Sequence, residues 1–204
     1  REAYGNENYL IIFSDSLSKL QIDYLKQIFF IHGKKISIFS TKKNVQQLND
    51  FISYEQMIKK LDITYLTDGT LSFEKIDDNS INIIISQACL EHVRKKEFKL
   101  FMDENYRVCK KGALSIHSID FKDHLDYSLN NLRFSESFWE SEFISSSGFY
   151  TNRLRYCDMK ELFLKSGFEI IKEDLSSWNE LPLIKTKFNQ DFIDYDESDL
   201  LVKE

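Results

Sequence analysis

Short apolar runs alternate with helical patterns along this chain. The first run, Tyr9–Phe13, is typical of a buried strand, and an amphipathic helical stripe from Leu17 to Phe29 follows it. A second strand is predicted at Ile36–Phe39, and a second helix extends from about Val45 to Lys60. The N-terminal part of the chain therefore repeats a unit of one strand followed by one helix.

The same alternation continues through the middle of the chain. Strands are predicted at Ile63–Leu66 and at Ile81–Ser86. The apolar stripe from Phe98 to Tyr106 predicts a helix, and a turn at Lys110–Gly112 closes it. The run Ala113–Ile119 then predicts a fifth buried strand.

One helix and two short strands are predicted in the C-terminal part. Asp158–Glu161 is similar to a capping box, with Asp in the place of Ser or Thr, and Gly167 marks the end of that helix. Strands are expected at Phe168–Ile171 and Leu200–Val202, and the acidic stretch Asp191–Asp199 is expected to be a solvated connection. Repeated strand–helix–strand units predict an α/β fold with a mostly parallel sheet and helices on both faces.

Composition narrows the class of protein. The 204 residues are 42% hydrophobic and 29% charged, which is typical of one globular domain without repeats. A net charge of -6 argues against a nucleic-acid groove, and three scattered cysteines argue against a disulfide framework or a cysteine-ligated zinc site. The chain has no apolar run of membrane-spanning length and no secretory pattern, so we expect no membrane partner and a cytoplasmic location.

The segment His117–His124 follows the fifth predicted strand and holds two imidazoles and two carboxylates. Any one of these groups alone would be interpreted as a helix cap or a core hydrogen-bonding residue. The four together, at a strand end where α/β sheets bind ligands, favour proton-transfer chemistry.

The spacing within this segment indicates which of its side chains can act together. Three residues of strand reverse the facing of a side chain, so His117 and Asp120 point the same way only if the strand ends between them. His124 shares the face of Asp120 if a helical turn follows. We therefore predict a His124–Asp120 pair as base and orienting group, with His117 as the competing base. No metal is predicted, because the usual further ligands to a His117–Asp120–His124 site are missing.

Several motifs together resemble a known family. They are Asn82–Val93 with its Leu-Glu-His-Val stretch, Tyr106–Val108, Lys110–Ala113, the segment His117–His124, and Tyr150–Arg155. This pattern is similar to class I S-adenosylmethionine-dependent methyltransferases, in a branch common among bacterial small-molecule and surface-polysaccharide methyltransferases. The resemblance covers roughly residues 60 to 175, and the preceding residues match only in the order of their elements.

The resemblance implies a Rossmann-like, seven-stranded sheet with an antiparallel last strand, and S-adenosylmethionine as the cofactor. It places cofactor contacts after the first, third and fourth strands, at Ser14, Asp15, Asp68, Gly69, Ser86 and Gln87. Asp68 is equally an ordinary turn residue before Gly69. The chain departs from the family because Ser14–Ser18 contains no glycine, so the backbone is less open to the cofactor.

The resemblance also places Glu91 and His92 near the site, although a carboxylate at a helix start interacts with the helix dipole just as naturally. Some quinone-pathway members bind a metal through an additional glutamate upstream of a similar Glu-His pair. Ala88 occupies that upstream position here, so the metal is not carried over.

The long segment from residue 121 to 155 has few strand signals and is predicted to be a substrate-covering insertion in the single domain 1–204. Asn152, Arg153 and Arg155 lie at its end. Arginine forks suit carboxylates and phosphates, so these residues predict an anionic acceptor such as a sugar nucleotide or a phosphorylated metabolite. Ion pairs with Asp or Glu are the alternative for both arginines.

Two function classes follow. The first is an active methyltransferase that most readily methylates oxygen on a small hydrophilic or anionic acceptor, in surface-polysaccharide or secondary metabolism. The second is a catalytically silent methyltransferase-like subunit that supports an active partner, as a homodimer or as a heterodimer with another methyltransferase. The glycine-free first loop favours the second, whereas the polar segment His117–His124 and the segment Asn152–Arg155 favour the first. A nicotinamide enzyme ranks third, because its phosphate-binding glycines are equally missing.

Overall fold

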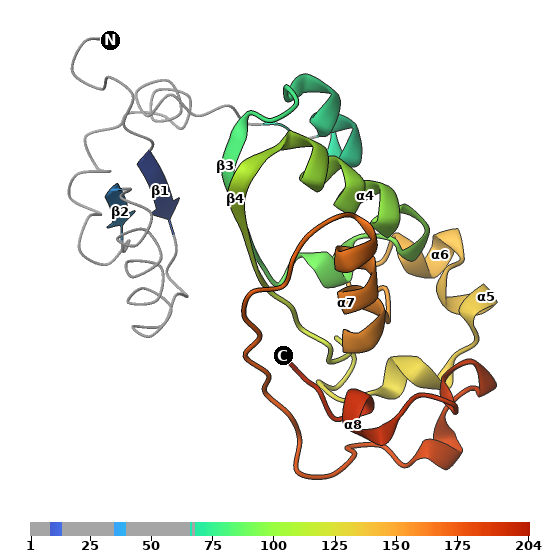
Figure 1. Cartoon of the computed structure of the whole chain (residues 1–204). Coiled ribbons are helices and arrows are strands. Elements are labelled where there is room, and N and C mark those ends of the chain that lie inside the picture. Colours follow the sequence, from blue (N-terminus) through green and yellow to red (C-terminus); the bar gives the residue numbers. More distant parts are fainter. Residues whose placement is uncertain (1–8, 14–34, 40–65, 67) are drawn as a thin grey trace, which may run out of the picture. The chain divides into compact units, whose positions relative to one another are not determined.

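The computed structural model describes residues 9–13, 35–39, 66 and 68–204 (Figure 1). The chain divides into two compact units, Arg1–Ser72 and Phe73–Glu204, which are described separately. The predicted helices at 17–29 and 45–60, and the strand at 63–66 apart from Leu66, lie outside the described residues. The predicted cofactor residues Ser14 and Asp15 also lie outside them.

The first unit contains two paired strands at the predicted positions. Strand β1 spans Tyr9–Phe13 and strand β2 spans Lys35–Phe39, one residue earlier than expected. They pair in parallel from Tyr9–Lys35 to Phe13–Phe39. Parallel pairing requires a crossover between the strands, which agrees with the strand–helix–strand order predicted for this part of the chain.

A strand–helix–strand unit forms the frame of the second unit (Figure 1). Strand β3 spans Ile81–Gln87, helix α4 spans Lys95–Val108 and strand β4 spans Cys109–Ser118. Strands β3 and β4 are parallel, and α4 is the crossover between them. The two strands end side by side, because Gln87 pairs with Ser118. Whatever follows the strands therefore meets at one edge of the sheet.

The start of β4 corrects one prediction. The turn expected at Lys110–Gly112 is part of the strand, which begins at Cys109. The register shifts between the pairs Ile81–Cys109 and Ile83–Leu114, so the extra residues of β4 bulge out of the ladder. Gly112 accommodates this irregularity with a φ of +76°.

The main core lies where α4 packs against helix α7, Tyr156–Lys165. Phe98 and Met102 on one face of α4 are fully buried, and Met159 of α7 packs into the same cluster. Their spacing is the helical period expected from the sequence. Full burial of side chains of this size contributes roughly 1.5–3 kcal/mol each, which fixes α4 beside α7.

Helix α7 begins two residues before the predicted start. Asp158 is the third helical residue rather than the cap, and its Oδ2 accepts a hydrogen bond of 2.8 Å from the backbone N–H of Arg155. Gly167 ends the helix as predicted, with a φ of +100°. The backbone N–H groups of Gly167 and Phe168 donate to Leu164 and Phe163, which is the Schellman arrangement.

The two strands expected last are not formed. Residues 168–171 are irregular, and the ring of Phe168 instead packs edge-on against Tyr106, 5.3 Å away between centroids. Leu200 belongs to the short helix α8, Glu197–Leu200, and is fully buried. Val202 makes only an isolated antiparallel bridge to Ser177. Leu200 and Val202 are buried, and Phe168 is partly buried against helices α4 and α7, so their hydrophobicity does not require a strand.

The predicted insertion 121–155 is built from short helices. They are the 3-10 helix η4 (Asn130–Arg133) and the helices α5 (Glu136–Trp139) and α6 (Glu142–Ser145). Trp139, Ile144 and Tyr150 form a small core of their own. A further core joins Leu132 of η4 to the C-terminal tail, which carries the 3-10 helices η5 (Lys185–Lys187) and η6 (Gln190–Phe192).

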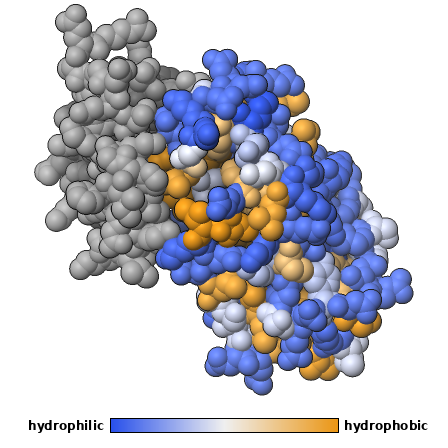
Figure 2. Space-filling model, in the orientation of Figure 1, coloured by the Kyte–Doolittle hydropathy of each residue, from blue (hydrophilic) through white to orange (hydrophobic). Residues whose placement is uncertain are grey.

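The surface of the described part is mixed. On the face shown in Figure 2, hydrophilic residues cover most of the area and hydrophobic residues gather in separate patches. Among the described residues, the most exposed large hydrophobic side chains are Phe143, Tyr127 and Ile171, at 80%, 74% and 71%. No helix among the described residues is both long and apolar enough to cross a membrane.

Candidate functional site

The loops after β3 and β4 meet at the edge of the sheet. After β3 the chain turns through Ala88, whose φ is +46° and whose N–H donates to the carbonyl of Ser118 at the end of β4. It then forms the 3-10 helix η3, Leu90–His92. This sharp turn carries Glu91 and His92 to the loop after β4, which holds Asp120 and His124.

Glu91, His92 and His124 form one cluster. Each offers one ligand-type atom, and these three atoms all lie within 4.8 Å of one another. The rings of His92 and His124 have centroids 4.8 Å apart and planes at 59°. The cluster joins both loops, although only His124 was among the predicted catalytic residues.

The carboxylate of Glu91 is buried without a partner. Glu91 is 2% exposed, and neither of its side-chain oxygens has a hydrogen-bond partner among the described residues. Burial raises the pKa of this carboxyl group, and the nearby Asp120 carboxylate adds to the rise. The N–H groups of Glu91 and Asp120 offset part of it without reaching hydrogen-bond geometry. An unsatisfied buried acid is costly and calls for a functional reason.

His92 has a defined tautomer. Its Nδ1 lies 2.9 Å from the carbonyl oxygen of Tyr150. A carbonyl only accepts hydrogen bonds, so Nδ1 carries the proton and donates it. In the neutral form of the ring, the lone pair is then on Nε2, where it can bind a ligand.

Asn152 holds the turn that carries Glu91 and His92. It is 1% exposed, and its Nδ2 donates to the carbonyls of Leu90 and Val93 at 2.8 and 2.9 Å. Its backbone N–H donates to the carbonyl of Glu91 at 2.7 Å. Asn152 was predicted to bind the acceptor. In the structure its amide clamps the η3 turn, and it therefore positions the cluster.

Asp123 organises the loop that carries His124. The residue is fully buried, and its Oδ1 accepts hydrogen bonds from the backbone N–H groups of Leu125 and Asp126 at 2.9 and 2.7 Å. Its Oδ2 accepts another from the N–H of Asn130. In the sequence, Asp123 is one of the two carboxylates of the segment His117–His124, and no separate role is predicted for it. The signal was local, because an Asp at the start of a polar loop commonly bonds the N–H groups that follow it.

Asp120 and His124 have different partners. Oδ1 of Asp120 accepts from the N–H of Lys122 at 2.9 Å and lies 3.3 Å from the Lys122 ammonium. Within residues 68–204 no hydrogen bond joins Asp120 to His124, whose ring lies against His92. Asp120 stays near Glu91, whose pKa it influences. The structure therefore brings both predicted residues to the same loop but does not pair them.

His117 lies within the sheet. Its Nδ1 is 2.7 Å from the hydroxyl of Ser86 and its Nε2 is 2.6 Å from the hydroxyl of Ser115. Burial lowers the pKa of His117 to about 4, so the ring is neutral at neutral pH. Ser86, predicted to line the cofactor, uses its hydroxyl for this contact. Gln87 ends β3 and is exposed together with Ala88.

Arg153 is held by backbone and by one carboxylate. It is 3% exposed, and its guanidinium donates to the carbonyls of Asn131 and Phe134 at 3.2 and 2.7 Å. It also pairs with Glu136 at 3.1 Å and lies over the ring of Trp139. The ion pair that was the alternative in the sequence is thus present, in a buried setting.

Arg155 is even more enclosed. It is 1% exposed, and its guanidinium donates to the carbonyls of Phe121 and Val202, both at 2.7 Å. Burial lowers the pKa of Arg155 to about 10, which still leaves it charged at neutral pH. Arg155 therefore ties the loop after β4 to the C-terminal tail, and no face of its guanidinium is open for an acceptor.

Asp68 and Gly69 belong to the first unit. The backbone N–H of Asp68 donates to the hydroxyl of Ser72 at 3.0 Å. Gly69 has a φ of +58° and begins the 3-10 helix η2, Gly69–Lys75. This is the geometry of the turn that was the alternative interpretation of Asp68.

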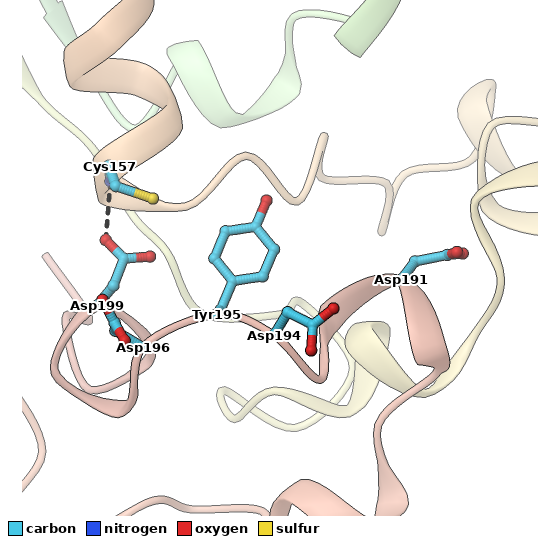
Figure 3. A pocket seen from close by; sticks show the side chains of 6 residues that line it. All are labelled: Cys157, Asp191, Asp194, Tyr195, Asp196 and Asp199. Atoms are coloured by element: carbon cyan, nitrogen blue, oxygen red, sulfur yellow. Dashed lines mark hydrogen bonds between the residues drawn. The ribbon is translucent and has the colours of Figure 1, made fainter.

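Apart from the cluster at the edge of the sheet, a pocket of about 310 Å³ lies beside the start of α7 (Figure 3). Asp199 is 8% exposed there, and its Oδ1 accepts a 2.8 Å hydrogen bond from the N–H of Cys157. The several Asp carboxylates that line this pocket make it unfavourable for an anionic acceptor. The stretch expected to be only a solvated connection therefore lines a pocket, together with α7, through Cys157, Asp191, Asp194, Tyr195, Asp196 and Asp199.

Comparison of this chain with protein-family models, with curated proteins and with solved structures finds no match.

Proposed function

We propose that this chain is an S-adenosylmethionine-dependent methyltransferase that acts on a small hydrophilic acceptor. The observation that carries the proposal is the meeting of Glu91 and His92 after β3 with Asp120 and His124 after β4. The carboxyl ends of neighbouring parallel strands are where open α/β sheets bind small molecules. The methyltransferase chemistry itself rests on the sequence resemblance over residues 60 to 175.

The residues on the cofactor side fit this proposal at β3. Gln87 and Ala88 are exposed at the end of the strand, where the proposal places the cofactor. The remaining proposed contacts are Ser14, Asp15, Asp68, Gly69 and Ser86. The cofactor supplies an activated methyl group, so the protein has to align the acceptor oxygen with it and receive the acceptor proton.

The proton acceptor in this proposal comes from the loop after β4. Asp120 is partly buried beside Glu91, and its pairing with Lys122 keeps one carboxylate oxygen oriented. His124 is the second candidate base, and His117 the third, although its low pKa makes it a weak base. The positive charge of Lys122 at this edge is paired with Asp120, and the guanidinium groups of Arg153 and Arg155 donate to backbone carbonyls. We therefore favour a neutral hydrophilic acceptor over an anionic one.

The alternative function is a catalytically silent subunit that supports an active methyltransferase. The observation that favours it is the stretch Ser14–Ser18, which contains no glycine where the family has its glycine-rich loop. A Cβ at each of these positions limits the approach of a cofactor to the backbone. A silent subunit would retain the acceptor cluster and would form a dimer with the active chain.

Calorimetric titration of the whole chain with S-adenosylmethionine separates the two functions. The enzyme proposal expects saturable binding, and methyl transfer that Asp120→Asn abolishes without changing the thermal midpoint. His124→Gln should lower the limiting rate. Undetectable binding at millimolar cofactor would reject the enzyme and favour the silent subunit. Turnover unchanged by Asp120→Asn would reject the assigned base.

A further inference from the structure

Glu91 is the starting point for a second inference. Its carboxylate lies in the interior with both oxygens unpartnered among the described residues, at a place where two imidazoles approach it. A buried carboxylate usually has an ion pair, hydrogen bonds or a metal to compensate for the loss of water. Within residues 68–204 the carboxylate of Glu91 has no ion pair or hydrogen bond, and the two imidazoles of the cluster are suitable further ligands for a metal.

His92 is prepared as a metal ligand. Ligating histidines almost always donate their other ring N–H to a carbonyl or a carboxylate, which fixes the ring and the tautomer. The 2.9 Å hydrogen bond from Nδ1 of His92 to the carbonyl of Tyr150 has this form. Asn152 lies two residues after Tyr150, and its side chain donates hydrogen bonds to the backbone on both sides of Glu91 and His92.

His124 completes the cluster from the other loop. Its ring is partly buried against His92, and Asp123 fixes the turn directly after it through three backbone N–H groups. Two ligands thus come from η3 and the third from the loop after β4. Both loops are held by buried polar side chains, which is the support that a precise site needs.

We propose that Glu91, His92 and His124 bind one divalent transition-metal ion of the zinc class. Two imidazoles and one carboxylate suit Zn²⁺, Co²⁺ or Fe²⁺, whereas Mg²⁺ and Ca²⁺ prefer all-oxygen sites. A tetrahedral ion with bonds of about 2.1 Å separates its ligand atoms by roughly 3.4 Å. The ligand atoms here lie within 4.8 Å of one another, so the cluster closes by no more than roughly 1.4 Å on binding.

Three protein ligands leave a coordination position open, as in catalytic rather than structural metal sites. Asp120 and Glu91 line the same small hollow, so Asp120 lies near the proposed ion. Metal binding does not depend on the proposed methyl transfer, so each can be tested without the other.

Cobalt titration tests the site directly. The whole chain, without an affinity tag and after dialysis against a chelator, is titrated with Co²⁺ while its visible absorption is recorded, and Zn²⁺ is then added as a competitor. We expect one Co²⁺ per chain, displaced by Zn²⁺ and not by Mg²⁺. Glu91→Gln, His92→Ala and His124→Ala should each raise the dissociation constant at least about 100-fold, since even outer-shell changes typically cost about 10–100-fold.

Two controls distinguish this cluster from other donors. Cys89→Ser removes an exposed thiol two residues from Glu91, and His117→Gln removes an imidazole that lies outside the cluster. Both should bind Co²⁺ as the unaltered chain does, and circular dichroism should show that all variants remain folded. The proposal is overturned if the unaltered chain binds no more Co²⁺ than His124→Ala, or if Cys89→Ser abolishes the spectrum while Glu91→Gln retains it.

Discussion

The Glu91–His92–His124 cluster and the segment Asn152–Arg155 contain the same kinds of polar groups, yet they differ in how these groups are satisfied. The amide of Asn152 and the guanidinium of Arg155 are buried, and they donate to two carbonyls each at 2.9 Å or less. Glu91 is equally buried, and neither oxygen of its carboxylate has a hydrogen-bond partner among the described residues.

This difference separates structural polar residues from candidate functional ones better than residue type does. A satisfied buried group holds backbone in place and has nothing left for a ligand. An unsatisfied group destabilises the empty protein and has its full bonding capacity available. Arg153 and Arg155 each donate to at least two carbonyls, although Nε of both and one terminal nitrogen of Arg153 have no hydrogen-bond partner among the described residues. Glu91 differs because neither oxygen of its carboxylate has a partner there, which makes it the stronger candidate for a functional group.

The largest expected effect comes from Arg155→Met, which keeps the apolar stem and removes the guanidinium. The carbonyls of Phe121 and Val202 lose their short hydrogen bonds while remaining buried. Leaving buried acceptors unpaired costs about 1–3 kcal/mol each, so we expect a loss of about 3–5 kcal/mol in unfolding free energy. Urea denaturation followed by tryptophan fluorescence measures it.

Arg133→Met is the matched control, because Arg133 is exposed. Its effect should stay within about 0.5 kcal/mol. If Arg155→Met were as mild as this control and instead weakened acceptor binding, Arg155 would be a ligand residue and the comparison would fail.

Sequence patterns predicted the local elements well. Strands β1, β2 and β3 and helix α7 start at or within two residues of their predicted positions, because hydrophobic periodicity depends only on residues close together in the sequence. The start of helix α4 itself was marked only by its apolar stripe from Phe98 to Tyr106. The missing strands at 168–171 and 200–202 show the limit. Apolar runs so short are equally suited to packing against a helix end, and tertiary contacts decide between the two.

The candidate site was predicted in part. The segment His117–His124 does deliver Asp120 and His124 to the edge of the sheet, as its position after a strand indicated. Which residues pair there could not be predicted, because His92 is oriented by Tyr150, 58 residues away, and Glu91 by the clamp of Asn152. Single-sequence patterns carry no information about contacts of that separation.

His117 extends the comparison to pH, because both of its ring nitrogens have hydrogen-bond partners and its burial makes the unfolding free energy depend on pH. Its pKa of about 4 lies below the ordinary value near 6.5, so the unfolded chain takes up the proton more readily than the folded one. The stability it provides is complete above pH 6.5 or so and is lost as the pH falls toward 4, by about 3 kcal/mol in total. Urea denaturation across this range measures the loss.

His117→Asn supplies the control for the pH series. Asn does not titrate, so the variant should be less stable at neutral pH and should lose less stability between pH 6.5 and 4 than the unaltered chain. Parallel curves for the two chains would show that His117 is not buried in its neutral form.

Asn152→Ala tests the clamp with an intermediate effect. The carbonyls of Leu90 and Val93 and the N–H of Leu154 lose their side-chain partner, which should cost about 2 kcal/mol. Because the clamp positions η3, Co²⁺ affinity should also fall. Asn179→Ala, at an exposed position, should change neither quantity. A stability loss with unchanged Co²⁺ affinity would separate the clamp from the cluster.

Glu91→Gln should change the unfolding free energy least of these substitutions, and it should raise it rather than lower it. In the metal-free chain the substitution removes a buried charge whose oxygens have no partners, so we expect the unfolding free energy to rise by about 1 kcal/mol. The gain should vanish in saturating Zn²⁺, because only the unaltered chain is then stabilised by the ion. Glu169→Gln, on an exposed carboxylate, should behave like the unaltered chain in both conditions. Destabilisation of the metal-free chain by Glu91→Gln would mean that the carboxylate already has a stabilising partner, and Glu91 would then belong with Arg155 among the structural groups.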